Sequence, residues 1–305
     1  MSQWSFLKVG CVLTYLLYSC LLIFPASKTF AMTLVLPENG NVVGHIKYIH
    51  ASPGEMLADI AIRYDVGLKQ LINANPTIAP RHPLSSSVRV LIPSQFILPK
   101  GSRQGIVINL AEYRLYFFPE NDNVVITHPI GIGRKGWATP TGITTIVKKE
   151  RNPVWRPTAN LIAASEKRGV MIPEEFPGGA SNPLGRYAFR LGWPTYLIHG
   201  TPRMDGIGER VSAGCIRMLA KDIEYLFDEV PIGTRVRVQN DSVKLGFLGH
   251  SIFVEIHPVL AGHPRRNLQT QLSQVLAKRG LIQTKDRPMV LKEMQHPSGV
   301  PLKIA

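Results

Sequence analysis

The segment His199–Met218 holds a histidine and a cysteine at a spacing that could support nucleophilic chemistry. A cysteine thiol attacks a carbonyl only as the thiolate, and a nearby histidine is the usual group that removes its proton. His199 follows the apolar run 196–198, which predicts a strand that ends at the histidine. Cys215 comes sixteen positions later, after a glycine-bearing loop and before a helix whose N-terminus would add partial positive charge. The sequence therefore predicts Cys215 as nucleophile and His199 as base.

Small and charged residues surround this cysteine. Gly214 has no side chain, so substrate could approach the sulfur and backbone N–H groups could point at a developing oxyanion. Arg217 supplies a fixed cation two positions after the cysteine, which suits a carboxylate, and Ser212 lies three positions before it. A lone buried cysteine near a histidine is nevertheless common and usually inert, so the pair needs support from the rest of the chain.

The N-terminus predicts export from the cytosol. Residues 1–8 carry one cation and no acid, residues 9–24 are almost continuously apolar, and Thr29 and Ala31 supply small side chains at the −3 and −1 positions of a cleavage site. This layout is typical of a secretory signal peptide, here residues 1–31. The alternatives are a membrane anchor that is not cleaved and a lipidated cysteine at Cys20. The apolar run is shorter than the ~20 residues that a membrane span needs.

Removal of the signal peptide would change the cysteine content. The chain has three cysteines, and two of them, Cys11 and Cys20, lie in the predicted signal peptide. The mature protein would keep Cys215 alone, in a compartment where thiols tend to form disulfides. A single thiol in such a place is either a buried bystander or a reactive group.

Composition indicates a folded, basic protein. The 305 residues are 45% hydrophobic and 18% charged, so disorder is excluded and about two domains of ~150 residues are expected. The formal net charge of +14 attracts polyanions of any kind. Outside the cytosol, nucleic acid is a poor partner, which leaves anionic wall polymers and lipid head groups.

Residues 32–99 form a first predicted module. Helical periodicity covers 55–64 and 66–75, and β-rich runs flank the pair at 46–49 and 88–92. This strand–helix–helix–strand pattern over residues 45–93 resembles a lysin motif, a small sugar-binding module of wall proteins. The alternative is a helical hairpin that only packs on the next domain.

Residues 104–239 form a second predicted module that is mainly β. Short strand-forming runs alternate with dense glycine and proline turns, a pattern that predicts a sandwich or barrel rather than a parallel sheet. One helix is predicted at 221–230, where Pro231 ends it. The predicted strands are 106–109, 114–118, 124–129, 144–148, 196–199 and 235–238.

Residues 240–305 form a C-terminal extension. A hairpin is predicted from strands 243–248 and 252–256, and a helix over 268–278. The last 25 residues are polar and contain proline, so they are predicted to be irregular.

The cysteine segment resembles the signature of the L,D-transpeptidase catalytic domain, in which a histidine precedes a Ser/Thr-His-Gly-Cys sequence and an Arg or Asn. One position departs, because Ala213 stands where the family has a second histidine. The resemblance extends to the blocks 108–116, 129–142 and 182–188. The matching residues of the signature are His199, Gly200, Thr201, Ser212, Gly214, Cys215, Ile216 and Arg217.

The resemblance implies a two-step acyl transfer on peptidoglycan. Cys215 would attack the carbonyl after the L-centre of diaminopimelate in a tetrapeptide stem, expel D-Ala, and pass the acyl group to an amine. His199 would move the protons and the Gly200 carbonyl would orient it. The N–H groups of Gly214 and Cys215 would bind the oxyanion, and Arg217 the stem carboxylate. Carbapenems acylate the same cysteine in this family.

The resemblance also implies a periplasmic, wall-associated enzyme without metal or cofactor. Its acceptor would be a second diaminopimelate stem, forming 3-3 cross-links, or an outer-membrane lipoprotein that becomes attached to the wall. No nucleic acid partner is expected, nor a membrane span after signal cleavage. Four histidines show no metal-ligand spacing and are expected to be structural or surface groups: His45, His50, His128 and His257.

Two other functions remain open at this stage. Water could replace the amine, which would make the chain an L,D-carboxypeptidase or amidase-type hydrolase of the same bond. The chain could also be an inactive wall-binding protein, for which Ala213 is the one feature in favour. A papain-like enzyme is disfavoured because such enzymes place the cysteine before the histidine.

Overall fold

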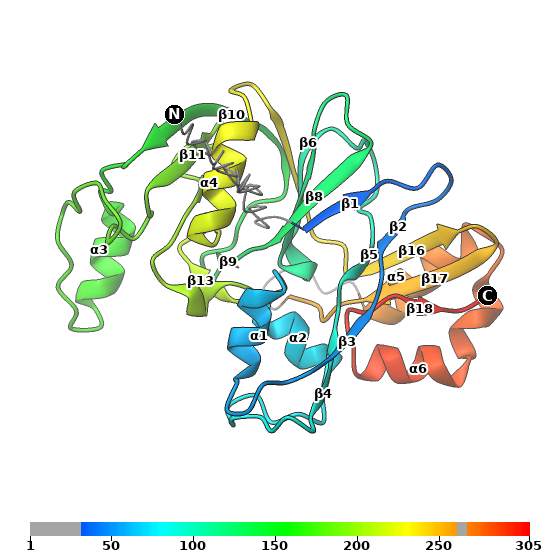
Figure 1. Ribbon diagram of the computed structural model, residues 1–305. Coiled ribbons are helices and arrows are strands. Elements are labelled where there is room, and N and C mark those ends of the chain that lie inside the picture. Colours follow the sequence, from blue (N-terminus) through cyan, green and yellow to red (C-terminus); the bar gives the residue numbers. More distant parts are fainter. Residues whose placement is uncertain (1–31, 261–266) are drawn as a thin grey trace, which may run out of the picture.

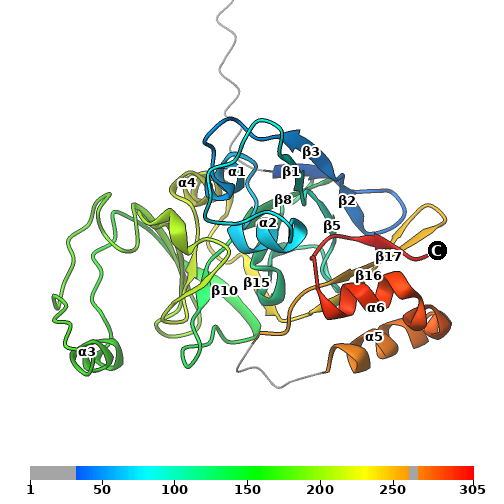
Figure 2. The ribbon, with the colours of Figure 1, turned by 90° about the horizontal axis from the view of Figure 1, so that it is seen from below.

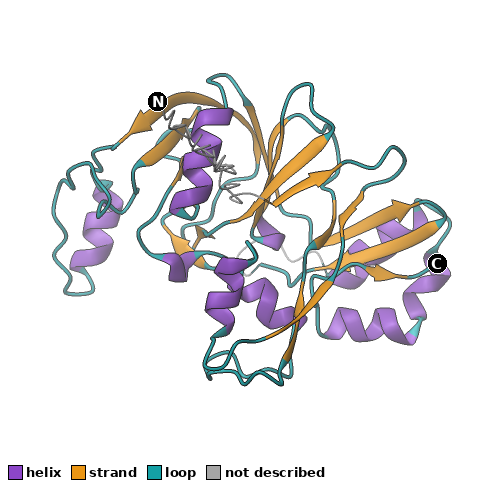
Figure 3. Cartoon of the chain, viewed as in Figure 1, coloured by secondary structure: helices purple, strands orange, loops and turns teal. Residues whose placement is uncertain are grey.

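The computed structural model describes residues 32–260 and 267–305, so the predicted signal peptide and its two cysteines lie outside the described residues. The largest sheet has the strand order β1-β8-β7-β6-β15-β10-β11-β12-β14 (Figures 1 and 3). Its neighbours are antiparallel except for the parallel pairs β6–β15 and β12–β14. The strands are β1 (Met32–Val35), β6 (Gly105–Asn109), β7 (Arg114–Phe118), β8 (Val124–Pro129), β10 (Gly142–Arg151), β11 (Tyr187–Leu191), β12 (Leu197–His199), β14 (Ile216–Arg217) and β15 (Arg235–Gln239).

Successive residues of the central strands enter two different cores. On β6, Ile106 and Ile108 pack into the core that α4 (Ala220–Glu229) covers, whereas Val107 packs with Phe96 and Val43 of the N-terminal segment. A sheet buried on both faces needs nearly continuous apolar strands, which is why these runs show little polar alternation. The prediction of a mainly β catalytic domain with a small N-terminal α+β region is confirmed.

The long strand β10 links the two halves of the sheet. Its first residues, Gly142–Thr145, pair with β15, and its later residues, Ile146–Arg151, pair with β11. The register shifts between Ile146 and Lys148, and such a bulge bends a strand. The half formed by β11, β12 and β14 holds His199 at the end of β12, and Cys215 directly precedes β14. The predicted strand 144–148 is shorter than β10, which continues through charged residues to Arg151.

The N-terminal segment shows the predicted strand–helix–helix–strand order. Strands β3 (Lys47–His50) and β4 (Arg89–Ile92) pair antiparallel, with α1 (Leu57–Arg63) and α2 (Leu68–Ala74) between them in sequence. A second pair, β2 (Val42–Gly44) with β5 (Gln95–Ile97), flanks this unit. Strand β1 extends the large sheet beside β8, so the first described residues belong to the catalytic sheet.

The C-terminal extension folds as a three-stranded sheet with two helices. The predicted hairpin is β16 (Val243–Leu248) with β17 (Ser251–Ile256), and the predicted helix is α5 (Leu268–Ala277). The prediction that the last 25 residues are irregular is wrong. They form the 3-10 helix η3 (Ile282–Asp286), α6 (Pro288–Gln295) and β18 (Leu302–Lys303), because Pro288 stands in the first turn of a helix, where no N–H is needed.

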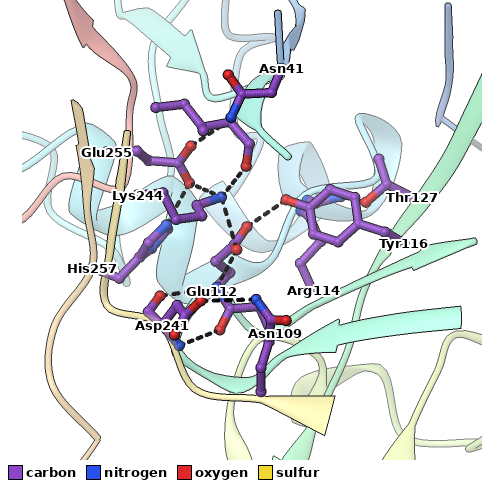
Figure 4. A network of polar contacts seen from close by, with 12 residues as sticks. Asn41, Asn109, Glu112, Arg114, Tyr116, Thr127, Asp241, Lys244, Glu255 and His257 are labelled. Carbon is purple, nitrogen blue, oxygen red and sulfur yellow. Dashed lines mark hydrogen bonds and ion pairs between the residues drawn. The ribbon is translucent and has the colours of Figure 1, made fainter. Parts of the chain in front are cut away.

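A buried ion cluster joins the extension to the other two parts of the chain (Figure 4). Lys244 Nζ lies 2.8 Å from Glu112 Oε1 of the catalytic domain and 2.8 Å from Glu255 Oε1 of β17. It also donates a 2.5 Å hydrogen bond to the Ile97 carbonyl of β5. His257 contacts the same Glu255 oxygen at 2.6 Å. Each buried charge therefore has an opposite charge beside it, as burial in a medium of low polarity requires.

One arm stands away from the sheets. Figures 1 and 2 show α3 (Ala159–Glu166) on the long loop between β10 and β11. The base of this loop closes where Trp155 and Phe176 exchange two backbone hydrogen bonds and their rings lie 4.9 Å apart. Met171 at the end of the arm is 84% exposed. The arm therefore presents apolar surface to its surroundings.

Candidate active site

The parallel pair β12–β14 brings the predicted catalytic residues to one place. Ile198 lies opposite Ile216, and His199 lies opposite Arg217. Cys215 directly precedes β14, two positions before Arg217. Paired residues of neighbouring strands share a face, so His199 and Arg217 lie on one face of the sheet, next to the segment that carries the cysteine. Sequence reasoning expected a strand end to meet a helix here, and instead two strand ends meet.

His199 is buried and held by its neighbour. Its Nδ1 donates a hydrogen bond of 2.5 Å to the carbonyl oxygen of Gly200. A carbonyl can only accept, so the proton is on Nδ1 and the lone pair is on Nε2. Burial lowers the pKa of His199 to about 4, although the carbonyls of Gly200 and Leu184 act in the opposite direction; the charge of Arg217 lowers it further. The imidazole is therefore neutral near pH 7 and able to accept a proton.

Cys215 is in its neutral form in the same environment. Burial raises the pKa of the thiol, while the Leu197 backbone and the Arg217 charge lower it. The sulfur lies 3.6 Å from the carbonyl oxygen of Thr195, which can accept a weak S–H hydrogen bond. A neutral thiol beside a neutral imidazole requires proton transfer during the attack itself. The site is thus arranged for general-base activation rather than for a preformed thiolate–imidazolium pair.

The helix that the sequence predicts after the cysteine, 221–230, is α4, and a strand stands between it and Cys215. Strand β14 follows Cys215, and α4 begins only at Ala220. The effect of a helix terminus falls off within one turn. The contribution of this helix N-terminus to the thiolate therefore stays a prediction.

Hydrogen bonds fix the backbone on both sides of the nucleophile. The Ser212 hydroxyl donates to the Cys215 carbonyl at 2.5 Å and accepts from the Gly214 N–H at 3.1 Å. Ser212 comes from β13 (Arg210–Ser212), which pairs with β9 (Ile132–Gly133). The Gly214 N–H was a predicted oxyanion donor, but in this structure its proton is directed at Ser212.

Gly214 is required for a different reason from the one predicted. Its φ is +111°, a conformation that side chains disfavour, and an added Cβ would lie 2.7 Å from Cε1 of Tyr196. A side chain at position 214 would therefore overlap the Tyr196 ring. Sequence reasoning missed Tyr196 because nothing local to it indicates contact with a glycine eighteen positions away.

Arg217 lies among other charged side chains beside the cysteine. Its pKa is lowered by burial and then by the charges of Arg203 and Arg134, and Asp205 acts in the opposite direction. Arg203 and Asp205 form an exposed ion pair at 3.1 Å, next to the 3-10 helix η2 (Met204–Gly206). Crowded guanidinium groups favour an anion between them, so this edge of the site suits a carboxylate.

Within residues 32–260 and 267–305, two buried groups combine acids with a histidine, as metal sites do, and both contain ion pairs. Around Glu112 and Glu255, the cation is the Lys244 ammonium. In the other group, His128 Nδ1 lies 3.4 Å from Asp65 and 3.5 Å from Asp222. Burial lowers the pKa of His128, but the two carboxylates outweigh it and raise the pKa to about 9. A protonated imidazole has no lone pair for a metal.

His128 and His257 are buried in ion clusters, while His45 and His50 are exposed. That the enzyme needs no metal or cofactor stays a prediction.

Comparison with known proteins gives a consistent result. The family model of the L,D-transpeptidase catalytic domain, YkuD, matches residues 103–238. The probable L,D-transpeptidase YcfS of Escherichia coli (strain K12) is 42% identical over 238 residues, which cover 76% of this chain and 74% of that protein. The probable L,D-transpeptidase ErfK/SrfK of Salmonella typhimurium is 38% identical over 279 residues, 88% of this chain and 89% of that protein. The solved structure of L,D-transpeptidase 3 from Mycobacterium tuberculosis aligns with a TM-score of 0.34 and 21% identity. The alignment covers 50% of this chain and 67% of the mycobacterial chain.

A buried, neutral histidine at the end of β12, with a cysteine directly before the neighbouring strand β14, is the arrangement of a cysteine-dependent enzyme. Given relatives above 30% identity along most of their length, the chain belongs to the L,D-transpeptidase family and acts on peptidoglycan. Among residues 32–260 and 267–305, no helix has the length and apolar character of a membrane span.

Proposed function

We propose that this enzyme transfers the acyl group of a tetrapeptide stem to an amine, with Cys215 as nucleophile and His199 as base. The observation that carries the proposal is the β12–β14 pairing, which sets His199 opposite Arg217, two positions after Cys215. The neutral, oriented imidazole supports the assignment, because a base must be unprotonated when the substrate arrives.

In the first step, the Cys215 sulfur bonds to the diaminopimelate carbonyl carbon while its proton moves to Nε2 of His199. The carbonyl oxygen becomes an oxyanion, which the Cys215 N–H stabilises. The bond to the nitrogen of D-Ala then breaks, and that nitrogen takes the proton from His199. The products are a thioester on Cys215 and free D-Ala.

In the second step, an acceptor amine attacks the thioester and gives its proton to His199. The carbon–sulfur bond breaks, and the sulfur recovers the proton. Arg217, with neighbouring guanidinium groups, binds a carboxylate of the stem. The acceptor is a second diaminopimelate side chain, which gives a 3-3 cross-link, or a lysine of an outer-membrane lipoprotein.

Incubation of the mature enzyme with purified muropeptides and mass spectrometry of the products tests this proposal. A new amide between stems, with release of D-Ala, supports transfer; a tripeptide alone supports the hydrolase, and no reaction supports an inactive wall-binding protein. Cys215→Ala is the matched control. Full activity in that variant contradicts the proposed nucleophile.

We further propose that residues 45–93 bind glycan and that the enzyme works in the periplasm after its signal peptide, residues 1–31, is removed. The order β3–α1–α2–β4 supports the first part, as does exposed Tyr48, whose ring lies 3.9 Å from the Arg89 guanidinium. Sedimentation with purified wall sacculi tests binding. Tyr48→Ala in the full mature chain should weaken it, and unchanged binding would assign the contact to another surface. N-terminal sequencing of the exported protein tests cleavage after Ala31.

A further inference from the structure

A buried threonine lies behind the nucleophile, on a loop that is distant in sequence. Thr139 is 4% exposed, and its hydroxyl donates a 2.8 Å hydrogen bond to the carbonyl oxygen of Gly214. The hydroxyl oxygen of Thr139 also accepts a 3.1 Å hydrogen bond from the Gly133 N–H. Both hydrogen-bonding functions of the hydroxyl are therefore used, and they fix its direction.

The loop that carries Thr139 is tied to the nucleophile's own segment. An added Cβ on Gly133 would lie 2.1 Å from the Trp137 carbonyl oxygen, so the loop 134–139 folds directly onto this glycine. Gly133 pairs with Ser212 between β9 and β13, and the Arg134 N–H donates to the Ser212 carbonyl at 3.0 Å. The position of Thr139 relative to the nucleophile's loop is therefore set by backbone contacts.

The bond from Thr139 has a consequence for the next N–H. The carbonyl of Gly214 and the N–H of Cys215 belong to one peptide plane, and in a trans peptide they point in opposite directions. Fixing the carbonyl therefore fixes the direction of the Cys215 N–H. The Gly214 N–H is held by Ser212, which leaves the Cys215 N–H as the oxyanion donor next to the nucleophile.

We propose that Thr139 is a positioning residue for the oxyanion: it holds the Gly214–Cys215 peptide so that the Cys215 N–H points at the carbonyl oxygen under attack. This inference rests on the proposed role of Cys215. The Thr139 hydroxyl acts through the backbone, because its hydrogen bonds go to the Gly133 N–H and the Gly214 carbonyl. Its effect should appear only in reactions of Cys215 that form an oxyanion, because alkylation of a thiol at a saturated carbon forms none.

The test compares two reactions of the same cysteine in the full mature chain. Acylation by ertapenem passes through a tetrahedral oxyanion, whereas alkylation by iodoacetamide does not. In Thr139→Val, the acylation rate should fall about 10- to 100-fold while the alkylation rate stays within about twofold. Thr139→Ser retains the hydroxyl and should recover most of the acylation rate.

Thr127→Val is the matched control. The Thr127 hydroxyl is also buried, donates to the Leu115 carbonyl at 2.8 Å and accepts from Arg114 at 3.2 Å, but it lies on β8, outside the site. The Thr127→Val variant should therefore leave the rates of acylation and alkylation unchanged. Equal loss of acylation and alkylation in Thr139→Val, or unchanged acylation, would overturn the proposal. Failure of the proposed function is distinguishable, because ertapenem would then not acylate the wild-type chain at Cys215.

Discussion

His199 donates a 2.5 Å hydrogen bond from Nδ1 to the carbonyl oxygen of Gly200, the next residue in the chain. A histidine bound by its own neighbour keeps its tautomer without a carboxylate partner. A carboxylate would raise the pKa of the imidazole strongly, whereas a neutral carbonyl raises it only weakly. Burial, which lowers the pKa, therefore prevails. The base is therefore oriented and still unprotonated at the pH of the cell envelope.

This relationship predicts the acid side of the pH profile. The folded pKa of His199 is about 4, so the imidazole is available above that pH and is lost as pH falls through it. The rate of Cys215 acylation should therefore change little through histidine protonation between pH 7 and 5, and should decline near pH 4. Stopped-flow acylation by ertapenem measures this, with circular dichroism to confirm folding at each pH. A decline centred near pH 6.5 would contradict the buried, neutral base.

The features that the sequence predicted correctly can be recognised from residues next to one another in the chain. The helix expected over 221–230 is α4, displaced by one residue, because periodic apolar positions and Pro231 mark it. His199 and Cys215 were found because few residue types do this chemistry. Their meeting through β12–β14 was not predictable, since the two-residue strand after Cys215 carries no periodicity.

The residues that were missed act across long sequence distances. Thr139 reaches a carbonyl 75 positions away, and Tyr196 fills the space beside Gly214. The block 129–142 was noticed, but no local pattern indicates which of its threonines is buried. The prediction that the last 25 residues are irregular is wrong because proline excludes a helix only from its interior, and Pro288 stands at the start of α6.

Gly214→Ala should destabilise the protein through both conformation and contact. Its φ of +111° costs about 1–3 kcal/mol for a residue with a side chain, and the new Cβ would lie 2.7 Å from the Tyr196 ring. Gly233→Ala is the matched control, because its φ is +92° and nothing lies within 4 Å of its added Cβ. Urea unfolding of both variants separates strain from clash. An equal decrease in the free energy of unfolding in both variants would mean that the Tyr196 ring moves away without cost.

The ion cluster Asp65–His128–Asp222 should make stability depend on pH. The two carboxylates raise the folded pKa of His128 from 6.5 to about 9, against the effect of burial. A raised pKa means that this stabilisation is complete below pH 6.5 and is lost as pH rises through about 9, at most about 3 kcal/mol. The difference in unfolding free energy between wild type and His128→Gln should therefore shrink from pH 6 to pH 10. A constant difference would indicate a packing role without charge.

Lys244→Met should be far more harmful than removal of a surface lysine. The ammonium of Lys244 is 1% exposed and lies 2.8 Å from both Glu112 and Glu255, so the variant leaves two carboxylates buried without their cation. Loss of one partner of a buried pair costs about 3–5 kcal/mol. Lys148→Met is the control, because Lys148 is 62% exposed in its 2.7 Å pair with Glu150, and such pairs contribute about 0–1 kcal/mol. Equal stability of the two variants would show that the carboxylates take up protons instead of remaining charged.

Lys244 also binds the Ile97 carbonyl, so its loss should release the C-terminal extension from the N-terminal segment. Limited proteolysis of the Lys244→Met variant should then cut near residues 240–242.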